Sequence, residues 1–260
     1  LQGAILAKKE LGAEDSLFLF GPEKEISDGL TEAGENLNDY IIVDCSQTIE
    51  MGDNPVKLFL EKTDSGMVKG FVYLSKGIID GFASAGNTGA MLVGATKVIG
   101  LVEGIIRPCI SSYYPNSEGK NNLIMDVGIN ADAKPENLVQ YATLGDLYAR
   151  NIMGIDNPKI ALLNIGEEES KGNANAKATY QLLKNVNSIN FIGNVEGGDL
   201  YKAGVVDVII TDGFTGNVVL KQAESFYQIV KERNISDNYF DNYNYENYGG
   251  TPILGVNATV

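Results

Sequence analysis

Short, unbroken apolar runs separated by longer stretches with helical spacing constrain the fold of this 260-residue chain more than any other feature. Seven runs have the length of a β-strand and are apolar nearly throughout, as strands buried on both faces are. They span residues 17–20, 40–44, 81–84, 123–127, 160–165, 189–192 and 206–211. Helices are expected at 56–76, 89–100, 135–153, 174–184 and 218–233. This alternation predicts an α/β fold with a mostly parallel sheet covered by helices.

No low-complexity linker divides the chain, so we expect a single α/β domain over residues 1–260. The chain opens inside a helix-like run and closes on a strand-like run at residues 255–260, so we expect its first strand and its closing end to be missing. The segment 237–250 is rich in Tyr, Asn and Asp and is expected to be a surface loop, with a partner contact as the alternative.

Composition excludes several classes of function. The chain contains no histidine, which rules out Ser-His-Asp and Cys-His nucleophile systems and every histidine-ligated zinc site. With 34 acidic and 20 basic residues its net charge is −14, which argues against a broad nucleic-acid-binding face. There is no apolar stretch of about 18 residues and no signal peptide, so a cytoplasmic location is expected. Cys45 and Cys109 lie far apart and are expected to be buried, reduced thiols.

Two turns rich in Gly, Asn and Thr follow predicted strands, where ligands bind in open α/β sheets. They contain Gly86, Asn87, Thr88 and Gly89 in the first turn, and Asp212, Gly213, Thr215, Gly216 and Asn217 in the second. Glycines let backbone amides approach a ligand and a helix N-terminus favours an anion, so two such turns on one sheet would suit a polyoxygen anion. A plain strand-to-helix turn is the alternative for the first. Neither turn matches GxxxxGK[ST] or GxGxxG, which disfavours an ATP-type or dinucleotide site.

Three further polar clusters come at the ends of predicted strands. Lys171 follows Glu167–Glu169, which is typical either of a solvated charge run or of a site placed after a buried strand. Asp126 and Asn130 follow another strand, where a carboxylate can orient a neighbouring amide or lysine or can cap the next helix. Asn194 follows a third.

Six ordered motifs resemble those of the bacterial phosphate acyltransferases of phospholipid synthesis, the PlsX family. They are SAGNTGAM, DVGINADAKPE, NIGEEESKGN, FIGNVEGGD, DGFTGNVVLK and YGGTPILGVN, and they span about residues 41–256. The resemblance implies a three-layer Rossmann-like sandwich, similar to phosphotransacetylases and isopropylmalate dehydrogenase-like folds. It also implies transfer of a long fatty acyl group from acyl carrier protein to inorganic phosphate, giving acyl phosphate. Phosphate is then the nucleophile and a thiolate leaves easily, so the lack of histidine is no obstacle.

The resemblance assigns roles to residues of this chain. Lys171 and Asn217 are expected to be catalytic, with Lys171 pairing with phosphate and Asn217 donating to the oxyanion or to a phosphate oxygen. Phosphate and substrate binding is expected from Gly86, Asn87, Thr88, Gly89, Asp126, Asn130, Asn194, Thr215 and Gly216. No metal and no cofactor is expected.

The resemblance also implies partners. It implies a homodimer and a peripheral contact with the membrane and with a glycerol-3-phosphate acyltransferase. In the family a helical hairpin, shortened here to residues 222–248, serves the dimer and membrane contacts. Lys69, Lys76, Arg107 and Lys120 are candidates for a basic patch that would receive the acidic carrier protein. Two other functions stay open: a phosphate acetyl- or butyryltransferase using coenzyme A thioesters, and an inactive carrier- or membrane-binding scaffold.

Overall fold

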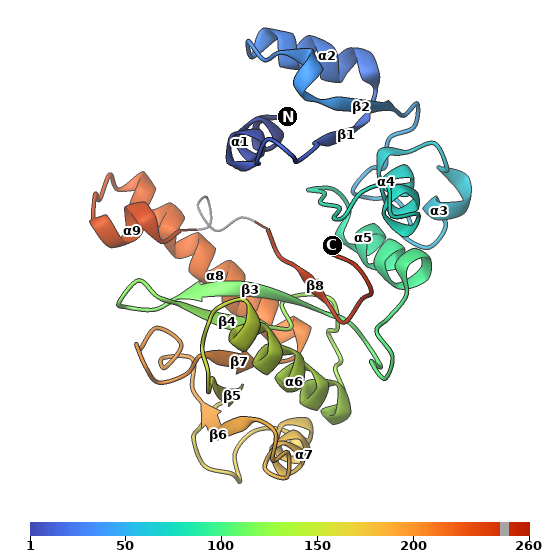
Figure 1. Ribbon diagram of the computed structural model, residues 1–260. Helices are drawn as coiled ribbons and strands as arrows, with labels where there is room; N and C mark the ends of the chain where they lie inside the picture. Colours follow the sequence, from blue (N-terminus) through green and yellow to red (C-terminus); the bar gives the residue numbers. More distant parts are fainter. Residues whose placement is uncertain (245–249) are drawn as a thin grey trace. The chain divides into compact units, whose positions relative to one another are not determined.

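The computed structural model describes residues 1–244 and 250–260. These residues form two compact units, Leu1–Leu101 with Val256–Val260, and Val102–Gly255 (Figure 1). The predicted hairpin at 222–248, the predicted loop at 237–250 and the start of the YGG motif extend into residues 245–249, which lie outside the described residues.

The first unit contains a two-stranded parallel sheet, in which β1 (Phe18–Gly21) pairs with β2 (Ile41–Asp44). Its helical segments are α1 (Gln2–Glu10), α2 (Glu23–Glu32), η1 (Leu37–Asp39), α3 (Leu58–Glu61), α4 (Gly66–Ser75), α5 (Thr88–Gly94) and the π-helical turn η2 (Ala95–Ile99). Helix α2 buries Ile26 and Leu30, which are four residues apart and so lie on one face. They pack with Tyr40 into a small apolar cluster beside the sheet.

Two predictions for this unit are corrected, and one helix was not predicted. The predicted helix at 56–76 is broken into α3 and α4, because the Ser65 hydroxyl accepts the Val68 N–H and starts a new helix. The predicted strand at 81–84 makes a single bridge, from Gly81 to Thr259, and belongs to neither sheet. Helix α2 was not expected, because its sequence is mostly polar and buries only two side chains.

The second unit contains a six-stranded sheet in the order β6-β5-β7-β4-β3-β8. Its strands are β3 (Cys109–Pro115), β4 (Asn121–Met125), β5 (Lys159–Leu163), β6 (Asn190–Val195), β7 (Val208–Ile210) and β8 (Ile253–Leu254). Strands β4, β5, β6 and β7 run parallel, whereas β3 pairs antiparallel with β4 and β8. The predicted α/β class with a mostly parallel sheet is confirmed. Strand β3 was missed because Ser, Tyr and Pro interrupt its apolar pattern.

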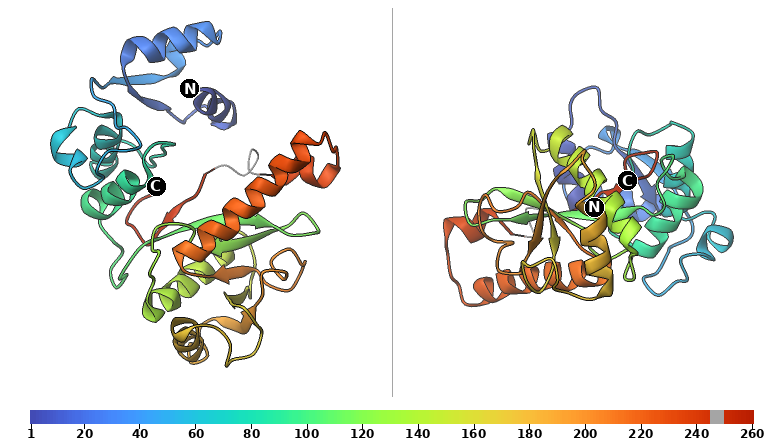
Figure 2. Two further views of the ribbon diagram at one scale, coloured as in Figure 1. Left: turned by 180° about the vertical axis from the view of Figure 1, so that it is seen from behind. Right: turned by 90° about the horizontal axis from the view of Figure 1, so that it is seen from below.

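Helices cover both faces of this sheet, which gives three layers. Helix α6 (Pro135–Asn151) packs against α7 (Ala174–Leu183) on one face, and α8 (Gly213–Glu232) lies on the other (Figures 1 and 2). Tyr141 of α6 and Met125, Val208 and Ile210 of the sheet are fully buried in the core under α6. This is the three-layer sandwich that the sequence motifs implied.

Two boundaries in the second unit differ from the prediction. Helix α8 begins at Gly213 instead of residue 218, because the carboxylate of Asp212 caps it. Within the predicted loop 237–250, residues Asn238–Asn242 form a short helix, α9, which is capped by Asp237. Side-chain caps therefore account for both corrections.

The two cysteines are free and fully buried, as expected. Burial raises the pKa of the Cys109 thiol well above its ordinary value, so this thiol stays protonated at neutral pH. Burial also raises the pKa of Cys45. Within the described ranges, none of the helices combines the length and apolar character needed to cross a lipid bilayer.

Candidate functional site

The carboxyl ends of β4, β5, β6 and β7 meet at one edge of the second unit's sheet, because these four strands run parallel. Four of the polar motifs follow these strands, at residues 126–134, 164–173, 195–199 and 211–217. Lys171 lies in the loop after β5, and Asn217 lies in the first turn of α8 after β7, the neighbouring strand. The two residues expected to be catalytic thus come from adjacent loops of one edge.

Lys171 is exposed, and its neighbours do not neutralise it. Glu169 instead accepts hydrogen bonds from Gln181 and from Lys184, whose ammonium lies 3.1 Å away. The Gln181 amide first, and then Lys184, hold the pKa of Glu169 below its ordinary value. No ion pair links Lys171 to an acidic side chain within residues 1–244 and 250–260. The ammonium of Lys171 is therefore available to an anionic ligand.

Asn194, the last-but-one residue of β6, supports the loop that contains Lys171 from the neighbouring strand. Its side chain is buried, and its Nδ2 donates to the backbone oxygens of Glu168 at 3.1 Å and Glu167 at 3.4 Å. Its Oδ1 is buried and has no hydrogen-bond partner among the described residues. Asn194 was predicted to bind phosphate, and the structure gives it a clear structural contact with the loop.

The first turn of α8 fixes Asn217. The carboxylate of Asp212 accepts both the N–H of Thr215, at 2.7 Å, and its hydroxyl, at 3.0 Å. Nδ2 of Asn217 donates to the carbonyl oxygen of Val127 at 3.2 Å, which leaves its second N–H and its Oδ1 for other partners. The amide of Asn217 is thus oriented by the loop that follows β4.

Glycines allow this turn to contact the loop after β4 so closely. A Cβ on Gly216 would overlap the carbonyl oxygen of Asp126, and one on Gly213 would lie 2.8 Å from the Asn130 nitrogen. The Gly213 N–H donates to the carbonyl oxygen of Asn130 at 2.8 Å. Residues with a side chain at these two positions would push α8 away from the loop.

Asp126 and Asn130 form a buried network inside that loop. One carboxylate oxygen of Asp126 accepts the backbone and side-chain N–H groups of Asn130, at 2.7 and 2.8 Å. The other accepts the backbone N–H groups of Ile110 and Ile129. Asp126 is completely buried, and the N-cap of α6 is Lys134, so the carboxylate orients an amide and does not cap the next helix.

A polar hollow of about 360 Å³ opens near the first turns of α7 and α8. It is lined by Ala131, Asp132, Ala133, Asn173, Asn175, Asp212, Phe214 and Thr215. The unpaired N–H groups and the dipole at the start of a helix favour an anion there. The carboxylates of Asp132 and Asp212 oppose an anion, so a bound phosphate would need a nearby cation. Lys171 lies only two residues before Asn173, the N-cap of α7.

Phe214 and Asn175 had not been singled out from the sequence. Phe214 is apolar, and Asn175 lies inside a helix, so neither stood out from residue type. Phe214 lies two residues after Asp212, and Asn175 lies two residues after Asn173. Asp212 and Asn173 are N-cap residues, so this spacing in the sequence is the signal that could have placed Phe214 and Asn175 in the hollow.

The turn at residues 86–89 belongs to the first unit, so the prediction that the two glycine-rich turns share one sheet is wrong. Asn87 is buried and caps α5 through the N–H of Ala90, at 3.0 Å. Its Nδ2 lies 3.2–3.3 Å from the carbonyl oxygens of Glu50, Met51 and Asp53. Gly86 donates to the Ser84 hydroxyl, and Thr88 and Gly89 open α5. A phosphate contact by this turn stays a prediction.

The proposed basic residues also divide between the units. Lys69 and Lys76 belong to the first unit, and Arg107 and Lys120 to the second. Lys69 lies 2.5 Å from Asp64, and Lys120 lies 3.6 Å from Glu118. Two of the four basic charges are therefore already paired.

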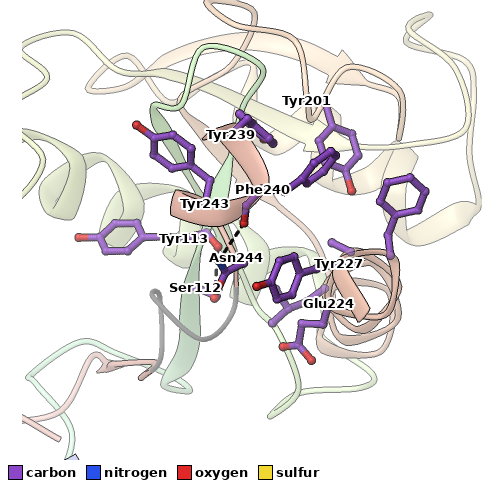
Figure 3. A pocket seen from close by; sticks show the side chains of 12 residues that line it. Ser112, Tyr113, Tyr201, Glu224, Tyr227, Tyr239, Phe240, Tyr243 and Asn244 are labelled. Atoms are coloured by element: carbon purple, nitrogen blue, oxygen red, sulfur yellow. Dashed lines mark hydrogen bonds between the residues drawn. The ribbon is translucent and has the colours of Figure 1, made fainter. Parts of the chain in front are cut away.

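A second, aromatic hollow of about 100 Å³ lies along α8, beyond the turn that holds Asn217 (Figure 3). Its labelled side chains come from β3, α8, the loop of Tyr201, and α9 with the two residues that follow it. The hydroxyl of Tyr239 donates to the carbonyl oxygen of Pro115 at 3.3 Å, and Nδ2 of Asn244 donates to that of Phe240 at 2.9 Å. The first of these two contacts holds α9 against the end of β3.

Comparison with known proteins decides the family. The model of a family described as "Fatty acid synthesis protein" matches residues 1–260. A phosphate acyltransferase of Staphylococcus aureus strain Newman is 42% identical over 94% of this chain and 78% of its own length, as is that of strain USA300. The chain belongs to the phosphate acyltransferase (PlsX) family. It is a transferase, as its motifs predicted, of the family that acts in fatty acid and phospholipid synthesis.

Solved structures of other phosphotransacylases share the fold of this phosphate acyltransferase family member. A EutD phosphotransacetylase from Staphylococcus aureus aligns with a TM-score of 0.63 at 16% identity, covering 99% of this chain and 84% of its own. A phosphotransacetylase from Streptococcus pyogenes has the same score and identity, covering 100% and 92%. A branched-chain phosphotransacylase from Enterococcus faecalis scores 0.57 at 15% identity, covering 100% and 85%. The predicted similarity to phosphotransacetylase folds is confirmed.

Proposed function

We propose that this chain transfers a long fatty acyl group from acyl carrier protein to inorganic phosphate, which gives an acyl phosphate for phospholipid synthesis. One observation carries the assignment of the site. The exposed ammonium of Lys171 and the oriented amide of Asn217 follow neighbouring parallel strands, on loops of the same sheet edge. A cation and an amide donor are what a phosphate nucleophile and a developing oxyanion require.

The reaction needs no nucleophile from the protein. An oxygen of hydrogen phosphate attacks the thioester carbonyl carbon, and the carbonyl oxygen takes up negative charge in the tetrahedral intermediate. The C–S bond then breaks, and the proton of the hydrogen phosphate ends on the released thiol. Lys171 would pair with the phosphate, and Asn217 would donate its second N–H to the oxyanion or to a phosphate oxygen.

The other predicted site residues fit this reaction in two ways. Thr215 and Gly216, in the first turn of α8, and Gly86, Asn87, Thr88 and Gly89, in the first unit, are proposed to contact phosphate or the thioester. The buried side chains of Asp126, Asn130 and Asn194 support the loops that carry the site, as their hydrogen bonds suggest. The proposal treats the whole of residues 1–260 as one acyltransferase.

The proposed setting is the cytoplasm, with acyl carrier protein as the donor. It includes a homodimer and a peripheral contact with the membrane, where a glycerol-3-phosphate acyltransferase would consume the acyl phosphate. The motifs that resemble the family support this setting.

A phosphate-dependent assay tests the reaction. The protein is incubated with palmitoyl-acyl carrier protein and phosphate, and hydroxylamine traps acyl phosphate as the hydroxamate. Hydroxamate that forms only with both protein and phosphate is the expected result. Tight binding of the carrier protein without any hydroxamate, when a relative is active in the same assay, would identify an inactive scaffold.

The acyl donor distinguishes the second candidate, a phosphate acetyl- or butyryltransferase that uses coenzyme A thioesters. This chain shares its fold with three phosphotransacylases, which is the reason to test this second candidate function. We expect palmitoyl-acyl carrier protein to give the higher kcat/KM. A higher kcat/KM with acetyl- or butyryl-coenzyme A would reject the long-chain proposal and support this alternative.

Lys171→Ala and Asn217→Ala test the catalytic assignment. Loss of one preorganised donor or cation typically lowers kcat on the order of 10²–10³-fold, and we expect this of each variant. Lys177→Ala is the matched control, because Lys177 is an exposed lysine on the neighbouring helix α7. Near-normal hydroxamate formation by Lys171→Ala would remove that residue from the mechanism.

A further inference from the structure

The side chain of Lys171 lies against Gly166, a buried glycine in the same loop. A Cβ built on Gly166 would lie 2.8 Å from Cγ and 3.3 Å from Cδ of Lys171, closer than such atoms normally approach. The remaining near atom is a carboxylate oxygen of Glu168, at 3.1 Å. Since the φ of Gly166 lies outside the left-handed region, the backbone would accept an alanine. The space above Gly166 is therefore occupied by the stem of Lys171.

Two asparagines hold the backbone of this loop at both ends. Nδ2 of Asn164 donates to the carbonyl oxygen of Lys171 at 3.3 Å, while its Oδ1 accepts the N–H of Ile165. Asn194 donates to the carbonyl oxygens of Glu167 and Glu168 from the neighbouring strand. The N–H of Lys171 closes the loop by donating to the carbonyl oxygen of Glu168 at 3.0 Å.

We propose that Asn164, Gly166 and Asn194 form a lysine seat, which fixes the position of the Lys171 ammonium for phosphate. This inference rests on the proposed function, in which Lys171 binds phosphate. Gly166 and Asn164 act through Lys171 and are positioning residues. Gly166 is the most specific member, because the three nearest atoms to the Cβ of an alanine there belong to the side chains of Lys171 and Glu168.

A fixed stem matters because lysine carries its charge on a flexible four-carbon chain. An exposed lysine without such contacts would sample many rotamers, and few of these would place the ammonium against phosphate. Displacement of a catalytic group by about 1 Å can lower a rate by about 100-fold. Gly166 leaves room for the stem of Lys171, and the side-chain amides of Asn164 and Asn194 fix the backbone of its loop. Together they remove part of the conformational freedom of the lysine.

Gly166→Ala is the decisive variant, measured in the phosphate-dependent assay. We expect kcat to fall by about 10- to 100-fold while KM for the acyl donor stays within about twofold, because the displaced ammonium acts on phosphate. Gly197→Ala is the control: Gly197 lies in the loop after β6 at the same edge, and nothing lies within 4 Å of its Cβ position. Thermal melting checks that both variants are folded.

The double variant Gly166→Ala with Lys171→Ala separates positioning from a general structural effect. If Gly166 acts through Lys171, the double variant has the kcat of Lys171→Ala alone. A further fall in the double variant, or a normal kcat in Gly166→Ala, overturns the inference. If Lys171→Ala is itself active, the catalytic role of Lys171 is wrong, and so is the lysine seat. This result differs from an inactive Lys171→Ala with a normal Gly166→Ala, which contradicts the seat alone.

Asn194→Asp provides a second variant if Gly166→Ala does not fold. A carboxylate of the same shape cannot donate to the carbonyl oxygens of Glu167 and Glu168, so the loop loses its support from β6. We expect kcat to fall by about 10-fold in this variant, and not to fall further in the Lys171→Ala background. Wild-type kcat in Asn194→Asp contradicts the seat.

Discussion

The loop that carries Lys171 and the helical turn that carries Asn217 lie at the same sheet edge but are held in different ways. The lysine loop is exposed, and side-chain amides of Asn164 and Asn194 support its backbone. The turn of α8 instead packs directly onto the loop after β4, through Gly213 and Gly216. The lysine loop is held by side-chain hydrogen bonds at the surface, and the turn of Asn217 is held by close backbone contact above a buried carboxylate.

This difference predicts how each region responds to substitution. Tightly packed backbone has no room to adjust, so a change in the turn of α8 is expected to lower both stability and activity. An exposed loop can shift at little cost in folding free energy, so a change there is expected to have only a small effect on stability. Three predictions test this contrast, beginning with the largest effect on stability.

Gly216→Ala is expected to destabilise the protein most. Its Cβ would overlap the carbonyl oxygen of Asp126, and backbone atoms cannot move aside as a flexible side chain can. We expect the free energy of unfolding to fall by about 3 kcal/mol or more, a strong overpacking effect, with activity lost in parallel. Urea denaturation followed by circular dichroism measures this change.

Gly3→Ala is its control, because Gly3 lies in helix α1 with nothing within 4 Å of its Cβ position. Alanine should be neutral there or raise stability by up to about 1 kcal/mol. A stable, active Gly216→Ala protein would mean that the turn of α8 can shift, and the contrast between the two regions would disappear.

Asp126→Asn is expected to have an intermediate effect. The carboxylate accepts four N–H groups, and an asparagine amide would offer an N–H to some of them. Leaving buried donors unpaired should cost about 2 kcal/mol, measured by the same urea titration. Asp132→Asn, an exposed change in the same loop, should leave stability unchanged. Equal stabilities for the two variants would show that the buried network does not hold the loop.

Glu169→Gln, in the lysine loop, should have the smallest effect. Because the folded state holds the pKa of Glu169 below its ordinary value of 4.5, its contribution to stability is present above that pH and is lost as the pH falls through the lowered pKa. We expect a melting temperature lower by about 1 °C at pH 7, with no difference from wild type well below pH 4. Differential scanning calorimetry at several pH values checks this. A difference that grows in acid would contradict it.

Much of the second unit could be predicted from its sequence. The apolar runs that became β4, β5 and β7 are largely buried on both faces, whereas β6, at the edge of the sheet, exposes Ile192. Such buried runs leave little choice other than a parallel sheet under helices. The missed elements have weak patterns: β3 mixes Ser, Tyr and Pro with apolar residues, and α9 is polar and aromatic. The predicted strand at 81–84 failed because four apolar or small residues are also compatible with a bridge in a loop.

The sequence by itself determined the fold class, the family and the identity of Lys171 and Asn217 as the residues to test, because ordered motifs and local apolar patterns are local properties of the chain. Only the tertiary structure shows which polar side chains are exposed and which are buried in hydrogen bonds. Asp126, Asn130 and Asn194 resemble ligand-binding residues in the sequence, yet all three are buried in hydrogen bonds to backbone or to one another. Partners such as Ile110, Pro108 and Glu168 come from other strands and loops, and folding alone brings them within hydrogen-bond distance.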